Sequence, residues 1–196
     1  PKAIDTINLD KDGSFDVREH LANPSLLIFQ GENDYIMLCP QKGEKIKINA
    51  NFDDLAVTYS ISGSVESQKL KELSDQQTKT RIVLKAMSDE MNMSNTSNVD
   101  SLKTIMRGRY EKLRENQRQY LINYINHNLG SLTTIVALYR NMENTPLIDF
   151  HTDLDIYKKV LSGLEKKYPN NQYTLDLKTF IQQNEELQQQ SANGEQ

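Results

Sequence analysis

The spacing of apolar residues changes at Ser62-Gly63-Ser64, and this change constrains the fold more than any other feature of the sequence. Before it, apolar and polar residues alternate between frequent turn residues, which is typical of short antiparallel strands. After it, apolar residues recur every three or four positions, which is typical of amphipathic helices. The sequence therefore predicts an α+β protein. We expect an antiparallel β meander or sandwich over residues 1–63, an α-helical domain of about five helices over 64–188, and a polar linker or tail over 189–196.

Six short segments before the junction are predicted strands, because each is apolar or alternating and is bounded by turn residues. They cover residues 4–9, 15–17, 25–30, 35–39, 44–50 and 57–61. Short turns of Asp, Asn, Gly and Pro separate them, so we expect successive hairpins rather than a parallel sheet.

The helical half begins with two long amphipathic segments, residues 65–91 and 102–125, which are separated by the polar break 94–98. We expect these two segments to form an antiparallel helical hairpin. Shorter helices are predicted to open at Ser131, to be capped by Thr152, and to run from Thr174 to about Gln188.

Charge is distributed unevenly along the 196 residues, which carry a net charge of −4. Residues 1–63 hold 6 Lys or Arg and 10 Asp or Glu, whereas the helical half holds 17 of each. This balance argues against a nucleic-acid-binding protein, whose surface would carry clustered basic residues.

No apolar run approaches the roughly 20 residues that a transmembrane helix needs, so we expect no transmembrane segment in this chain. No signal peptide is visible, and a strand-like segment begins almost directly after Pro1. We therefore expect a trimmed or processed chain from which a targeting segment has been removed.

The single cysteine, Cys39, ends one of the predicted strands. It has no second cysteine for an internal disulfide or for a C-x-x-C motif. No cationic residue adjoins it in sequence to lower the pKa of its thiol, so we interpret it as a small buried hydrophobic residue.

Residues 8–19 also fit the spacing of a twelve-residue calcium loop. Asn8 begins a row of oxygen-bearing side chains at alternate positions, Gly13 allows a sharp bend, and Glu19 ends the loop. However, the first position holds Asn, no helix-like pattern precedes the loop, and a proline soon follows it. A plain hairpin is therefore the preferred interpretation, with calcium binding as the alternative.

His151 is the histidine with the most acidic neighbours, since Asp149, Asp153 and Asp155 lie close to it in sequence. A metal or acid–base site would need these side chains to converge, whereas neighbours at a helix start diverge and complement the helix dipole. We favour the second interpretation. We predict no catalytic, cofactor-binding or metal-binding residue in this chain, and no cofactor.

Four tyrosines are the residues that we predict to form an interaction surface. Tyr110, Tyr120 and Tyr124 recur on one predicted helix, and Tyr59 lies beside the junction. These residues could line a groove between the β half and the helices. The alternative is that they belong to the core and leave only their hydroxyl groups in water.

A series of short motifs occurs in an order similar to that of a known family. In the β half these are Ile4-Asp5-Thr6, Leu9 to Phe15, Tyr35-Ile36-x-Leu38, Gly43 to Ile48, and Ile61-Ser62-Gly63-Ser64. In the helical half they are Tyr124 to Asn128, Asn144-Thr145-Pro146-Leu147, and Leu164-x-Lys166-x-Tyr168-Pro169-Asn170. The chain resembles the N-terminal domain-of-unknown-function module, with its following helical segment, of TlpA/ResA-type thioredoxin-like thiol–disulfide oxidoreductases of Gram-negative cell envelopes.

The resemblance implies a modular parent protein. In that family a signal peptide or lipoprotein anchor precedes the module, and a thioredoxin-like domain with C-x-x-C follows it. This chain would then be a non-catalytic accessory region, a spacer and docking surface for a thioredoxin-like domain in cis, expected beyond Gln196. A protein substrate is a second expected partner. The expected location is the periplasm or cell envelope, with or without a lipid anchor.

The alternative function is a stand-alone binding module. Such a module would hold a peptide or a small ligand between the β half and the helices, where clefts commonly form. Exposed apolar surface near the tyrosines would favour this alternative, whereas a tightly filled junction would not.

Overall fold

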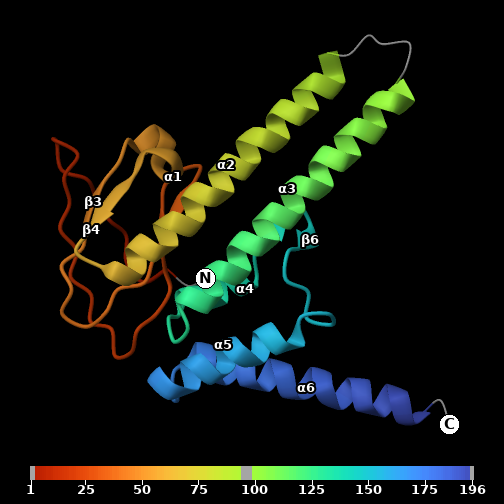
Figure 1. Ribbon diagram of the computed structural model, residues 1–196. Coiled ribbons are helices and arrows are strands. Elements are labelled where there is room, and N and C mark those ends of the chain that lie inside the picture. The colour runs from red at the N-terminus through yellow and green to blue at the C-terminus, as the bar shows by residue number, and fades with distance from the viewer. Residues whose placement is uncertain (1–2, 94–98, 195–196) are drawn as a thin grey trace.

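Short strands precede long helices in the computed structural model, which describes residues 3–93 and 99–194 (Figure 1). The strands are β1 (Leu27–Gln30), β2 (Tyr35–Leu38), β3 (Lys47–Asn49), β4 (Ser60–Ser62), β5 (Asn141–Met142) and β6 (Thr145–Pro146). The helices are the 3-10 helix η1 (Phe52–Asp54), α1 (Leu55–Thr58), α2 (Val65–Met93), α3 (Val99–His127), α4 (Thr133–Leu138), α5 (Leu154–Lys167) and α6 (Gln172–Gly194). The predicted α+β class, with antiparallel strands followed by helices, is confirmed.

The strands of the described residues form three antiparallel pairs. In the β1–β2 pair Phe29 lies opposite Ile36, and in the β3–β4 pair Ile48 lies opposite Ile61. The third pair, β5–β6, lies inside the helical half and was not predicted, because its strands are only two residues long. A small hydrophobic cluster holds the first two pairs together, and its buried members are Ile36, Leu55, Tyr59 and Ile61.

The strands predicted at residues 4–9 and 15–17 are wrong, because residues 3–26 contain no strand. Apolar alternation stabilises a strand only when one face is buried against a partner, and Ile4 is 62% exposed. Phe15 nevertheless stacks on Phe29 of β1, with ring centroids 5.3 Å apart. The segment therefore packs against the β half through side chains without joining a ladder.

The last strand predicted before the junction is also corrected. Residues 55–58 form α1, and only Ser60–Ser62 form the strand β4. Asn51 starts the helical turn, since its side chain accepts a hydrogen bond from the Asp53 amide at 3.2 Å. This local cap outweighs the β propensity of the valine and threonine that follow.

The junction between the two halves depends on two residues. Gly63 adopts φ +85°, and a Cβ at this position would lie 1.9 Å from the carbonyl oxygen of Lys45. Ser64 then starts α2, because its Oγ accepts the Ser67 amide at 3.2 Å. The chain therefore turns from β4 into α2 at a position where a side chain does not fit.

The helices α2 and α3 form the predicted antiparallel hairpin, and its outer part extends beyond the rest of the molecule (Figure 1). We call residues 78–93 of α2 and 99–112 of α3 the helical arm. Lower on the hairpin, α2 contacts β2, β4 and α4, and α3 contacts α4. The predicted polar break at 94–98 lies outside the described residues.

The main hydrophobic core lies below the arm, where the base of the hairpin meets α4, α5 and α6. Its completely buried side chains include Ile125, Leu132, Leu138, Ile148, Val160 and Leu164.

Two predicted helix boundaries are corrected by the structure. The N-cap position of α5 is Asp153 rather than Thr152, and α6 continues to Gly194 instead of ending near residue 188.

Candidate functional site

The four predicted tyrosines do not form one open surface. Tyr59 and Tyr124 are buried, with 3% and 6% of their surfaces exposed, and Tyr110 and Tyr120 are half-buried. The Tyr124 hydroxyl donates to Oγ1 of Thr133 at 2.7 Å. Burial raises the pKa of Tyr124 and Tyr59 above the ordinary tyrosine value. These two tyrosines therefore fill the junction rather than line a groove there.

The half-buried tyrosines lie higher on α3. The Tyr110 hydroxyl donates to a carboxylate oxygen of Glu143 at 3.1 Å, which ties the arm to the β5–β6 turn. Glu143 occupies that tight turn with φ +54°, so this hydrogen bond helps to hold a conformation that non-glycine residues seldom adopt. Tyr120 packs near Tyr124, with ring centroids 6.4 Å apart.

Arg140 lies at the same junction, and sequence reasoning missed it. Its guanidinium donates through Nη1 to the side-chain oxygen of Gln77 in α2. Its Nε is buried and has no hydrogen-bond partner among residues 3–93 and 99–194. The sequence offered only one basic residue between a short helix and a turn, and no pattern marks such a residue as buried.

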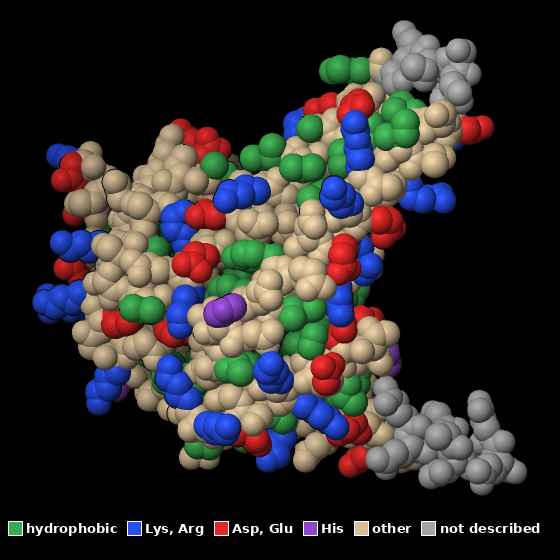
Figure 2. All heavy atoms as spheres, viewed as in Figure 1, with side chains coloured by type: hydrophobic (Ala, Val, Ile, Leu, Met, Phe, Trp, Pro, Cys, Tyr) green, Lys and Arg blue, Asp and Glu red, His purple; other side chains and the backbone are tan. Residues whose placement is uncertain are grey.

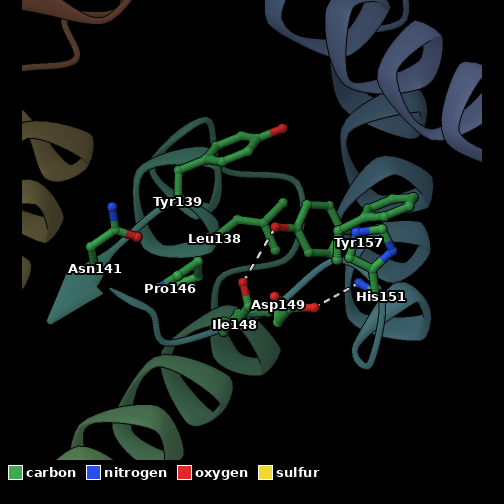
Figure 3. Close-up of a pocket in the computed structure, with 9 residues that line it drawn as sticks. Leu138, Tyr139, Asn141, Pro146, Ile148, Asp149, His151 and Tyr157 are labelled. Atoms are coloured by element: carbon green, nitrogen blue, oxygen red, sulfur yellow. Dashed lines mark hydrogen bonds between the residues drawn. The ribbon is translucent and has the colours of Figure 1, made fainter. Parts of the chain in front are cut away.

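A pocket of about 260 Å³ lies between the β5–β6 turn and α5 (Figure 3). Figure 3 shows Tyr139 on one side of this pocket and Tyr157 on the other, with the Tyr157 hydroxyl directed to the carbonyl oxygen of Ile148 at 3.4 Å. Burial raises the pKa of Tyr157 to about 12. The pocket wall thus combines aliphatic and polar side chains with the rings of Tyr139 and Tyr157, whose phenol groups stay protonated near neutral pH.

His151 and its acidic neighbours do not converge on one point. Asp149 accepts the backbone amide of His151 at 2.9 Å and so closes a turn. Asp153 points elsewhere and binds Arg118 of α3, while Asp155 is exposed in the first turn of α5. Asp155 therefore stands in the first turn of α5, where an acidic side chain complements the helix dipole.

Arg118 and Asp153 form an ion pair between α3 and the N-cap of α5. Arg118 donates through Nη1 and Nη2 to the two carboxylate oxygens at 2.7 and 2.6 Å, and also to the Leu147 carbonyl at 3.0 Å. The hydrogen bonds from Arg118 lower the pKa of Asp153, and the resulting carboxylate raises the pKa of Arg118. This bidentate pair joins the base of the arm to the start of α5.

The proposed calcium loop is an exposed turn. The Asp10 amide donates to the Ser14 carbonyl at 2.8 Å, and the Ser14 hydroxyl donates to Asp12 at 2.7 Å. The Asp12 carboxylate is thus occupied within the turn, and hydrogen bonds from Ser14 lower its pKa. Across residues 3–93 and 99–194, no three His, Cys, Asp or Glu side chains are grouped as metal ligands.

Cys39 is completely buried at the end of β2. Its amide donates to the Ser67 hydroxyl of α2 at 3.0 Å, so it joins the β half to the hairpin. Burial raises the pKa of the thiol to about 12, and the nearby carboxylate of Glu66 adds to this effect. A thiol of this kind remains protonated and is a poor nucleophile.

Apolar side chains are exposed along the helical arm (Figure 2). Ile82 is 63% exposed and Met93 is 83% exposed on α2, and Ile105 is 51% exposed on α3. Residues 78–112 hold seven Lys or Arg and four Asp or Glu, so the arm carries a charge of +3 against −7 for the rest of the chain. Exposed apolar side chains on a segment of net positive charge offer a surface that a partner protein could cover.

Comparison of the chain with protein-family models, with curated proteins and with solved structures gives no match. The similarity to TlpA/ResA-type proteins therefore rests on the order of the sequence motifs alone. None of the described helices combines the length and the apolar character needed to cross a membrane.

Proposed function

We propose that this chain is the non-catalytic accessory region of an envelope thiol–disulfide oxidoreductase, where it spaces and docks a thioredoxin-like domain of the same polypeptide. The observation that carries this proposal is the helical arm, which extends beyond the core and exposes apolar side chains. The motif order seen in the sequence supports the choice of family. A periplasmic or envelope location belongs to the same proposal.

The spacer role follows from the way the arm is held. Each helix of the hairpin has 29 residues and is therefore about 43 Å long. At the base, the Arg118–Asp153 pair fixes α3 to α5. Near the start of α2, Glu66 accepts hydrogen bonds from Ser131 and from Lys69, which ties α2 to the segment before α4.

The docking role follows from the chemistry of the arm. Ile82 and Ile105 remain exposed although they belong to helices whose inner faces bury Thr80 and Met106. Burial of such side chains would contribute about 1.5–3 kcal/mol each. The positive charge of the arm favours a partner surface with apolar residues at its centre and acidic residues at its rim.

The first test of the proposal is whether this chain catalyses disulfide reduction. Cys39 is the single cysteine and its thiol is buried, so we expect no insulin reduction by the chain in the presence of dithiothreitol beyond the uncatalysed rate. A Cys39→Ser variant should behave identically, with a thioredoxin as the positive control. Turnover that disappears in Cys39→Ser would contradict the proposal.

The coding sequence beyond Gln196 should continue into a thioredoxin-like domain with C-x-x-C.

A second candidate function is a stand-alone module that binds a ligand at the β/helical junction. Tyr59 and Tyr124 fill much of that junction, which argues against a site for a large ligand. The unpaired Nε of Arg140 favours this candidate nonetheless, because a buried polar group without a partner calls for an explanation.

A further inference from the structure

The guanidinium of Arg140 is half-buried at the junction, and no carboxylate of the described residues is paired with it. Arg140 lies directly before β5, and its side chain reaches Gln77 of α2. The charged or titratable groups that face it are the phenols of Tyr35, Tyr59 and Tyr124. Nε is shielded from water and makes no hydrogen bond within the part of the chain that the structure describes.

This arrangement is unfavourable for the free protein. Removal of a guanidinium from water costs several kcal/mol unless a carboxylate and further hydrogen bonds compensate for it. Burial lowers the pKa of Arg140 below the ordinary arginine value, yet an arginine side chain still keeps its proton near neutral pH and so does not relieve the cost by becoming neutral. In Arg118 of the same chain this cost is offset, because its guanidinium donates to both carboxylate oxygens of Asp153.

The edge of the Arg140 guanidinium that carries the unpaired Nε has the shape that a carboxylate matches. Gln77 occupies Nη1, and the opposite edge of a guanidinium presents Nε and Nη2 as two parallel donors. Two parallel N–H donors match the two oxygens of a carboxylate. Tyr35 stands at the start of β2 with half of its surface exposed, so the junction meets solvent on this side.

We propose that Arg140 is an oxyanion-binding residue at the β/helical junction, and that its ligand is the carboxylate group of a small organic acid. The ligand would supply the negative charge and the acceptors that Nε lacks. No thioredoxin-like domain is needed for this binding, so it can succeed or fail independently of the accessory role.

Thermal melting in sodium acetate tests this site with the chain as it exists. At constant ionic strength, acetate in place of chloride should raise the melting temperature by about 3–6 °C when it reaches roughly ten times its dissociation constant. Sodium phosphate at the same ionic strength should have a smaller effect. A response to phosphate without a response to acetate would overturn the carboxylate assignment.

Two variants separate binding at Arg140 from a general salt effect. Arg140→Met should lose the acetate response, whereas Arg81→Met should keep it, because Arg81 is exposed on α2, where its Nη2 donates to the Thr78 hydroxyl. Arg140→Lys should respond more weakly, since lysine lacks the planar pair of donors. An equal acetate response in native chain and Arg140→Met would overturn the proposal.

A second measurement does not depend on the folding of any variant. In the native chain labelled with ¹⁵N, the Nε–H resonance of Arg140 should move with acetate in a saturable way, while the Arg118 resonance stays in place. An Arg140 resonance that does not move over the whole titration would also overturn the proposal.

Discussion

Replacement of Gly63 by alanine is expected to lower the free energy of unfolding by about 3–4 kcal/mol. The backbone here has φ +85°, and the new Cβ would meet the Lys45 carbonyl oxygen at 1.9 Å. That neighbour is backbone of the segment leading into β3, so relief would require the β3–β4 pair to move. Urea unfolding followed by circular dichroism measures the change.

Gly43→Ala is the matched control for this prediction. Gly43 has φ +82°, yet nothing lies within 4 Å of the position that its Cβ would take. Only the conformational cost remains there, which amounts to about 1–2 kcal/mol. Equal destabilisation by the two substitutions would show that the contact between the junction and Lys45 is not formed.

Replacement of Asp153 by asparagine is expected to lower the free energy of unfolding by about 3 kcal/mol at neutral pH. The substitution leaves the half-buried Arg118 without its carboxylate partner. It also weakens the hydrogen bond that the Asp149 amide donates to the Asp153 carboxylate, which is 2.9 Å long in the native chain. The exposed pair of Arg18 and Asp16 provides the control. Asp16→Asn should cause no measurable change, because exposed pairs contribute little.

The contribution of Asp153 should also depend on pH. Hydrogen bonds from Arg118 hold the pKa of Asp153 below its ordinary value in the folded protein, while the unfolded chain has a pKa near 3.9. The stabilisation is therefore complete above about pH 4 and is lost as the pH falls through the folded-state pKa. The stability difference between native chain and Asp153→Asn should shrink in that range; a constant difference down to the acid limit would contradict this account.

The helical half could be predicted from the sequence because its signal is long and redundant. Leu113, Leu121 and Ile125 recur on one face of α3 over several turns. One polar residue at an apolar position therefore does not hide the helical spacing of three to four residues. The β half was harder to predict. The N-terminal alternation around Ile4 has no structural consequence, because strand formation depends on a partner that a local pattern does not specify.

The candidate site could be predicted only in part, for a related reason. Tyr59 and Tyr124 were recognised from their position and spacing, but spacing does not distinguish a buried tyrosine from one that lines a groove. Arg140 carried no pattern at all, since its environment is assembled from α2, β2 and the segment after α4. Burial of a charge at such a meeting point is a tertiary property that the neighbouring sequence does not encode.

Amide hydrogen exchange in the helical arm tests the docking role most directly. The experiment compares this chain alone with the intact polypeptide that contains the expected thioredoxin-like domain. We predict that amides of residues 80–93 and 99–108 exchange about tenfold more slowly in the intact polypeptide, because docking on Ile82 and Ile105 opposes local opening. Amides near Gly13, far from the arm in sequence, should be unchanged. Equal exchange in the arm with and without that domain would contradict the account.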